Sequence, residues 1–173
     1  TKSQGLAETS GVGLHAFVDE SKRGGYVVVA TISARHDLTT TRKALRELLL
    51  PGQSALHFKD EKDGRRRRLI TAMCTFPVDA TIFVSPLKDQ VTARRLCLTA
   101  MIDVLAQQHA ERVVLERADG DLVADKRTLF QAVRSAGVEG ALRYDHLRAS
   151  EEPLLWVSDA VAWCWSHGGH WRE

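Results

Sequence analysis

Three carboxylates in this 173-residue sequence stand where an acidic side chain is chemically informative. Asp159 interrupts an otherwise apolar stretch, residues 154–165, whose apolar side chains would cover every side of a helix, so that helix is expected to be largely buried. Asp19 follows a mostly apolar run, and Glu116 ends another. Burying an ionised carboxylate without a partner costs several kcal/mol, so Asp159 must meet a cation, a metal ion or a set of hydrogen-bond donors.

Each of these acids also has an ordinary structural interpretation. Asp159 would face water, or pair with Arg143 or Arg148, if its helix were rotated. Residues 19–21 are of the types that form hairpin turns. Glu116 can be interpreted as the first residue of a loop.

Oxygen donors on three separate elements favour one kind of metal chemistry. Without a pair of histidines at metal-ligand spacing, carboxylates favour Mg²⁺ or Mn²⁺ over zinc. A divalent cation also makes the clustering of mutually repelling carboxylates tolerable. Two such ions about 3.5–4 Å apart activate a water and stabilise the leaving oxygen in phosphodiester hydrolysis. Asp119, in the loop after Glu116, is a reserve ligand.

The elements that must position these acids alternate between strand and helix. Alternating or β-branched residues predict the strands, and apolar residues at helical spacing predict the helices. A run of threonines is able to cap the first helix, and two glycines in ESKRGG join the first two strands as an antiparallel hairpin. The expected strands are 14–19, 26–34, 78–85, 112–117 and 141–148, and the expected helices are 42–50, 63–75, 90–109, 125–136 and 153–166. We therefore predict one α/β domain over residues 1–173 with a helical insertion at about 35–76.

Composition excludes several classes of protein. With 44% hydrophobic and 27% charged residues, the chain is neither disordered nor collagen-like. It has no apolar run long enough for a membrane helix, and TKSQGLAETS at its start has no apolar core or cleavage site, so a cytoplasmic protein is expected. The net charge of +2 does not indicate nucleic-acid binding, which must come from local arrangement.

Two features resemble the ribonuclease H-like superfamily. The segment FVDES followed by GGYVV is similar to that family's opening hairpin. The order of elements resembles its three-stranded meander followed by α-β-α-β-α, with the helices at about 42–75 as an insertion before the third strand. The resemblance spans about residues 14–166 and implies a mixed five-stranded sheet flanked by helices, with strands one to three antiparallel and strands four and five parallel.

A narrower resemblance concerns a large bacterial branch of that fold. The branch typically has Asp-Glu-Ser on the first strand and an Ala-Asp pair in a buried last helix. Here DES begins at residue 19, and LWVSDAVAW lies near the end of the chain. The segment LHFK at 56–59 is similar to a histidine-containing segment of the branch.

The resemblance assigns roles by position. It implies that Asp19, Glu116 (or Asp119) and Asp159 are catalytic ligands of Mg²⁺ or Mn²⁺ in a two-metal-ion nuclease. Ribonuclease H proper supplies a further glutamate from the helix that matches 90–109, where no acid is well placed, so Glu20 is a candidate substitute. Two functions stay open: a metal-dependent nuclease, or a catalytically inactive module that binds nucleic acid or protein.

Basic and polar residues near Asp19 are candidate contacts to a nucleic-acid partner. Four successive arginines, 65–68, point about 100° apart on a helix and cannot all face one phosphate groove, so a solvated helix end is the simpler interpretation. The hairpin residues are equally good turn formers, and a surface or core role is an alternative for the histidine. The predicted contacts are Ser21, Lys22, Arg23, His57 and Lys59.

Overall fold

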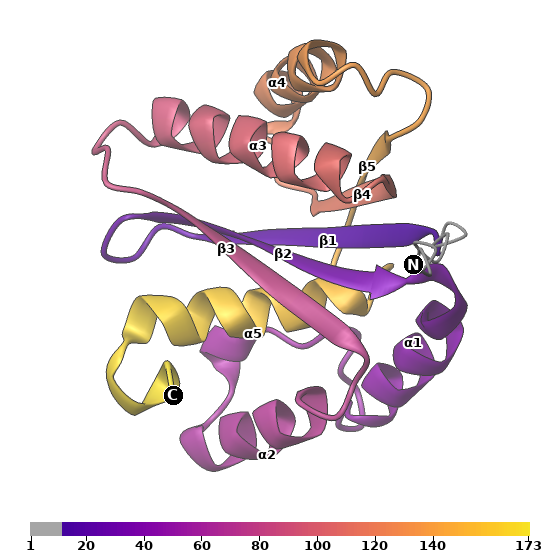
Figure 1. The fold of residues 1–173 in the computed structure, drawn as a ribbon. Coiled ribbons are helices and arrows are strands. Elements are labelled where there is room, and N and C mark those ends of the chain that lie inside the picture. Colours follow the sequence, from indigo (N-terminus) through magenta and orange to yellow (C-terminus); the bar gives the residue numbers. More distant parts are fainter. Residues whose placement is uncertain (1–11) are drawn as a thin grey trace, which may run out of the picture.

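A computed structural model, which describes residues 12–173, places five strands in one mixed sheet (Figure 1). The strand order is β3-β2-β1-β4-β5. Neighbours β3, β2 and β1 pair antiparallel, whereas β1, β4 and β5 pair parallel, which confirms the predicted fold class. The strands are β1 (Leu14–Ser21), β2 (Tyr26–Ala34), β3 (Val78–Ser85), β4 (Ala110–Glu116) and β5 (Arg143–Leu147).

Helices cover both faces of this sheet. In Figure 1, α3 and α4 lie above the sheet, and α5 lies below it with α1 and α2 further out. The insertion predicted between the second and third strands is present, and it comprises α1, α2 and the short 3₁₀ turns η1 and η2. The helices are α1 (Leu38–Glu47), α2 (Asp63–Met73), α3 (Gln90–Gln107), α4 (Leu122–Ser135) and α5 (Leu154–His167), and the 3₁₀ turns are η1 (Arg35–Asp37), η2 (Phe58–Asp60) and η3 (Gly169–Trp171).

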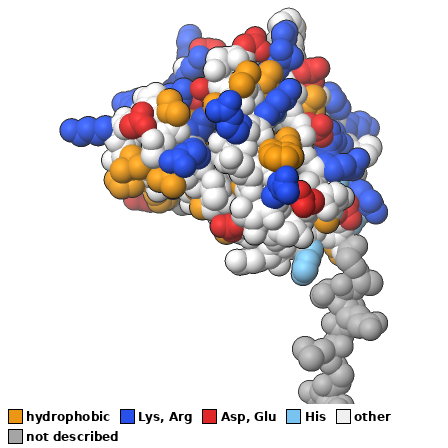
Figure 2. Space-filling view, turned by 90° about the horizontal axis from the view of Figure 1, so that it is seen from above, with side chains coloured by type: hydrophobic (Ala, Val, Ile, Leu, Met, Phe, Trp, Pro, Cys, Tyr) orange, Lys and Arg blue, Asp and Glu red, His pale blue; other side chains and the backbone are white. Residues whose placement is uncertain are grey.

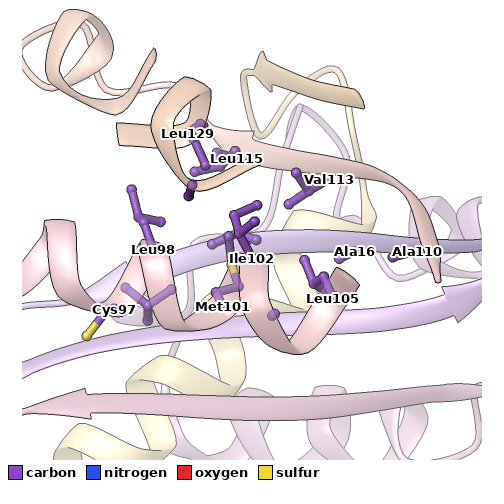
Figure 3. Close-up of a cluster of buried hydrophobic side chains, with 14 of the residues drawn as sticks. Ala16, Cys97, Leu98, Met101, Ile102, Leu105, Ala110, Val113, Leu115 and Leu129 are labelled. Carbon is purple, nitrogen blue, oxygen red and sulfur yellow. The ribbon is translucent and has the colours of Figure 1, made fainter. Parts of the chain in front are cut away.

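The core above the sheet is built by one stripe of α3 (Figure 3). Leu98, Met101, Ile102 and Leu105 recur at helical spacing, and each is at most 1% exposed. They pack against small and branched residues of β1 and β4 and against Leu129 of α4. This packing holds α3 against one face of the sheet.

The core below the sheet is centred on the first half of α5. Residues 154–158 are buried, and the indole N–H of Trp156 donates to the Ala149 carbonyl at 2.7 Å. From Trp163 onward most side chains of α5 are only half-buried. The expected burial on all sides therefore holds for the first part of the helix alone.

All ten predicted elements are present, with ends displaced by at most four residues. The expected threonine cap is wrong. Helix α1 begins at Leu38, directly after η1, so the threonines lie inside its first turns and Asp37 occupies the N-cap without a capping side-chain hydrogen bond.

Within residues 12–173, none of the helices combines the length and apolarity that crossing a bilayer requires. The expectation drawn from TKSQGLAETS falls on residues 1–11, outside the described part of the chain. Figure 2, which views the molecule from above Figure 1, shows Lys and Arg side chains interspersed with acidic and apolar ones. On this face the nearly balanced charge of the chain is not sorted into a single basic patch.

Replacing Ser158 by Ala is expected to lower the free energy of unfolding by about 1–3 kcal/mol. The fully buried Ser158 hydroxyl donates to the Phe17 carbonyl and lies 2.7 Å from the Thr31 hydroxyl, so it links α5 to β1 and β2. Urea unfolding measures the change. The matched control is Ser150→Ala in an exposed turn, expected to stay within about 0.5 kcal/mol of wild type. Equal losses in both variants would contradict this role.

Candidate functional site

Three predicted acids converge at the carboxyl ends of β1 and β4, which are inner strands of the sheet. β1 and β4 are parallel neighbours in which Val18 pairs with Leu115, so Asp19 and Glu116, the next residue of each strand, emerge side by side. α5 runs beneath these strands and brings Asp159 to the same place. The ion pairs of the described residues 12–173 leave Asp19, Glu116 and Asp159 without a Lys, Arg or His partner.

Asp19 is the most buried of the three acids, with 8% of its surface exposed. Burial raises the pKa of its carboxyl group well above the ordinary value. Glu116 and then Asp159 raise this pKa further, through their negative charges and by accepting a hydrogen bond from its protonated form. The three groups therefore cannot all be ionised at low cost unless a cation joins them.

Asp159 is held by a backbone donor of the insertion. The Phe58 N–H donates to its Oδ2 at 2.6 Å. Burial raises the pKa of Asp159 and the charge of Glu116 raises it further, whereas the Phe58 hydrogen bond and the nearby His57 and Lys59 oppose the rise. The alternative in which this acid pairs with an arginine of the β5 region does not occur.

Glu20, the proposed substitute ligand, has other partners. Its carboxylate contacts the Arg94 guanidinium and the Tyr26 hydroxyl, and Lys22 Nζ lies 3.4 Å away. Arg94 belongs to α3, the helix in which the resemblance leads one to look for a glutamate. Glu20 can serve as a ligand only if this ion pair opens.

Arg94 is itself anchored in a buried polar network that sequence reasoning missed. It donates to both carboxylate oxygens of Asp125 at 2.6 Å, and His146 Nε2 lies 3.2 Å from that carboxylate. The side chains of Asp125 and His146 are 2% and 5% exposed. Because the partners lie on three different elements, no local spacing in the sequence indicates this network.

Asp119 lies apart from the three convergent acids. Its side chain is 74% exposed, and the neighbouring Arg117 Nε donates to it at 2.7 Å. This hydrogen bond and the charge of Arg117 lower the pKa of Asp119. Glu116 is therefore the acid that β4 brings to the site.

The predicted substrate contacts lie on two sides of Asp159. The hairpin supplies Ser21, Lys22 and Arg23, of which the two basic residues are exposed. The insertion supplies the exposed residues His57 and Lys59. A cleft between them is lined by Asp159 and by all of these residues except His57.

The arginine run divides, as expected, among different faces of α2. Arg66 donates to the carbonyls of Phe58 and Lys59 at 2.8 and 2.9 Å, and its guanidinium lies 4.2 Å from the centroid of the Trp163 ring. Arg68, by contrast, is exposed. Arg66 therefore fixes the η2 segment whose N–H binds Asp159, a role that only the folded chain reveals.

The donor chemistry at this edge suits Mg²⁺ or Mn²⁺, because every candidate ligand is a carboxylate. In the part of the chain from residue 12 onward, no three His, Cys, Asp or Glu side chains are already arranged at metal-ligand spacing. Coordination of one ion by these carboxylates would require their side chains to shift.

No family model matches this sequence, and no curated protein is significantly similar to it. Among solved structures, the RNase HII of Archaeoglobus fulgidus, determined in complex with PCNA, is similar with a TM-score of 0.59 and 16% identity. The similarity covers 89% of this chain and 73% of that chain. The chain has a ribonuclease H-like fold. At this identity the comparison establishes the fold alone.

Replacing Asp19 by Asn is expected to stabilise the protein at pH 7 without divalent ions, by on the order of 1–3 kcal/mol. Since folding raises the pKa of Asp19, the unfolded chain ionises at lower pH than the folded protein. The stability contributed by this group is full below the ordinary carboxyl pKa and is lost as pH rises toward the raised value. The Asp19→Asn variant does not lose this stability as pH rises. Denaturant unfolding in EDTA between about pH 4 and pH 8 measures the difference in the free energy of unfolding between the two proteins.

The control for that experiment is Asp103→Asn, an exposed position on α3, which is expected to follow the wild-type profile. Parallel pH profiles for wild type and Asp19→Asn would contradict the raised pKa of Asp19.

Replacing Arg66 by Met is expected to lower the free energy of unfolding by about 2 kcal/mol, because two charged hydrogen bonds to backbone carbonyls are lost. Amide hydrogen exchange at Phe58 is expected to accelerate, since η2 is no longer held. Arg68→Met is the matched control, with a change within about 0.5 kcal/mol. Unchanged exchange at Phe58 in the Arg66 variant would show that η2 is fixed by other contacts.

Proposed function

We propose that this protein is a metal-dependent nuclease that hydrolyses phosphodiester bonds of nucleic acids. Asp19, Glu116 and Asp159 would hold Mg²⁺ or Mn²⁺ at the carboxyl ends of β1 and β4. The observation that carries the proposal is the convergence of three acids that lack cationic partners among residues 12–173, with a raised pKa at Asp19. Such a cluster is costly unless a divalent cation neutralises it.

The residues of the chain would divide the work. A bound divalent ion supplies Lewis acidity and lowers the pKa of water. The Phe58 N–H and Arg66 would keep Asp159 in position. Ser21, Lys22, Arg23, His57 and Lys59, at the rim, would position the phosphates of the substrate.

A mechanism with two metal ions would need a further carboxylate ligand at the site. It would require Glu20 to leave Arg94, or Asp119 to leave Arg117, and join the three convergent acids. The bacterial branch, the cytoplasmic location and the single-domain organisation stay predictions. The nucleic-acid partner is proposed without a choice between RNA, DNA and hybrid.

Two observations favour the alternative, a catalytically inactive module that binds nucleic acid or protein. Arg94 holds Glu20 in an ion pair, and no ready-made ligand spacing exists within the described chain. The two functions differ in whether the acids bind a metal ion and whether the bound nucleic acid is cleaved.

The decisive experiment compares wild type with Asp159→Asn and Asp19→Asn on labelled single-stranded, duplex and hybrid substrates, with Mn²⁺, with Mg²⁺ and with EDTA. Wild type is expected to cleave at least one substrate only with metal. Each variant is expected to lose more than about 100-fold, because even partners outside the ligand shell are typically worth 10–100-fold. Asp103→Asn is the control and is expected to keep wild-type activity.

Calorimetric titration with Mn²⁺ separates the alternatives. A binding signal that disappears in Asp19→Ala supports the nuclease. No metal binding, together with salt-sensitive nucleic-acid binding and no cleavage, would support the inactive module.

A further inference from the structure

A groove leads away from the convergent acids along the end of α5. Two adjoining hollows of about 460 and 470 Å³ share four lining residues, so they form one continuous depression, here called the basic groove. The inner hollow reaches Asp159, and the outer one reaches Arg66 and Trp171. In Figure 1 the β1–β2 turn and the C-terminal end of α5 lie on the same side of the molecule. The four shared residues are Arg23, Lys59, Trp163 and His167.

The charge of the groove changes along its length. Asp159 marks the acidic inner end. In the outer hollow, Arg23, Lys59 and Arg66 line the walls together with a single acid, Asp63, whose carboxylate is already bound by Arg66 at 2.7 Å. A polyanion with one phosphate at the carboxylate site would therefore meet cations as it leaves that site.

The indole ring of Trp163, which lines both hollows, is not open to nucleobases. The His167 ring stacks on Trp163 with centroids 3.5 Å apart, and the Arg66 guanidinium lies 4.2 Å from the Trp163 centroid. Two groups so close to one ring cannot share a face without overlapping, so both faces are covered. Bases therefore have no free face of Trp163 on which to stack. Trp171, in the outer hollow, is approached by the Arg67 guanidinium and the His170 ring, which lie 5.5 and 4.9 Å from its centroid.

Arg23 reaches across the groove to a weak acceptor. His167 Nδ1 lies 3.0 Å from the Trp163 carbonyl, which can only accept, so Nδ1 carries the proton and Nε2 accepts from Arg23. A phosphate oxygen is a stronger acceptor for a guanidinium than a neutral imidazole, because the hydrogen bond is then charge-assisted on both sides. A phosphate entering the groove would therefore draw Arg23 away from His167.

We infer that the basic groove binds the phosphate backbone of a single nucleic-acid strand without reading its bases. Arg23 and Lys59 are the principal contacts, and Arg66 and His167 shape the wall around Trp163. The inference rests on the proposed function for the direction of the strand, which runs from the carboxylate site outward. Binding itself requires no metal ion.

The size of the groove selects one strand over a duplex. A hollow of about 460 Å³ equals a cube with edges of about 8 Å, whereas the major groove alone of B-DNA is about 12 Å wide. Two backbones separated by that width cannot both enter the groove, so a duplex could place only one of its two strands there.

Fluorescence anisotropy with labelled 12-nucleotide oligo(dT) and oligo(dA), in EDTA and over a salt series, tests the inference. Arg23→Gln and Lys59→Gln are each expected to weaken binding about 5–10-fold and to flatten the salt slope by about 0.7. Arg68→Gln removes the same charge outside the groove and is expected to change affinity less than about 2-fold. A blunt 12-base-pair duplex is expected to bind at least about 10-fold more weakly.

Three results would each overturn the inference: an Arg68→Gln loss as large as that of Arg23→Gln, equal binding of duplex and single strand, or a preference above about 10-fold between oligo(dA) and oligo(dT). Because EDTA prevents metal-dependent cleavage, these outcomes are independent of nuclease activity. If wild type cleaves and the Arg23 and Lys59 variants bind as tightly as wild type, the inference of groove binding is contradicted and the proposed nuclease activity is not. If the groove binds nucleic acid and no metal ion supports cleavage, the proposed nuclease activity is contradicted and groove binding is not.

Discussion

The mutual repulsion of carboxylates in a poorly solvated place is the constraint that organises this molecule. Asp19 and Glu116 are forced together by parallel pairing of β1 and β4, and α5 adds Asp159 from below. A fold under selection for stability alone would separate such groups or neutralise them with arginines. Here Arg94 forms ion pairs with Glu20 and Asp125. It forms none with Asp19, Glu116 or Asp159.

The helical insertion between β2 and β3 belongs functionally to this edge of the sheet. In its η2 segment, the Phe58 N–H donates a hydrogen bond to Asp159 that opposes the cost of burial, and Arg66 of α2 donates to two backbone carbonyls of that segment. The same segment carries Lys59 to the rim. The sheet and α5 thus supply the acids, and the insertion supplies their restraint and part of the surrounding positive charge.

Much of the fold could be predicted because burial leaves a local pattern. The apolar stripe of α3 and the β-branched run of β2 identify their elements without knowledge of any partner. Asp159 was found because a charge within an apolar helix is itself a local anomaly. The Arg94 network and the role of Arg66 could not be found, since these side chains and their partners are joined only by tertiary packing, and the threonine cap of α1 failed because η1 precedes the helix.

If divalent cations bind at the ends of β1 and β4, the Arg94–Glu20 ion pair would set the order in which they bind. Asp19, Glu116 and Asp159, which meet no guanidinium among residues 12–173, would bind the first ion. Glu20 becomes available only against the pull of an arginine that is clamped by both oxygens of Asp125, itself in contact with His146. Binding of two ions would thereby be stepwise, and the second step would depend on Asp125 of α4 and His146 of β5 through their hold on Arg94.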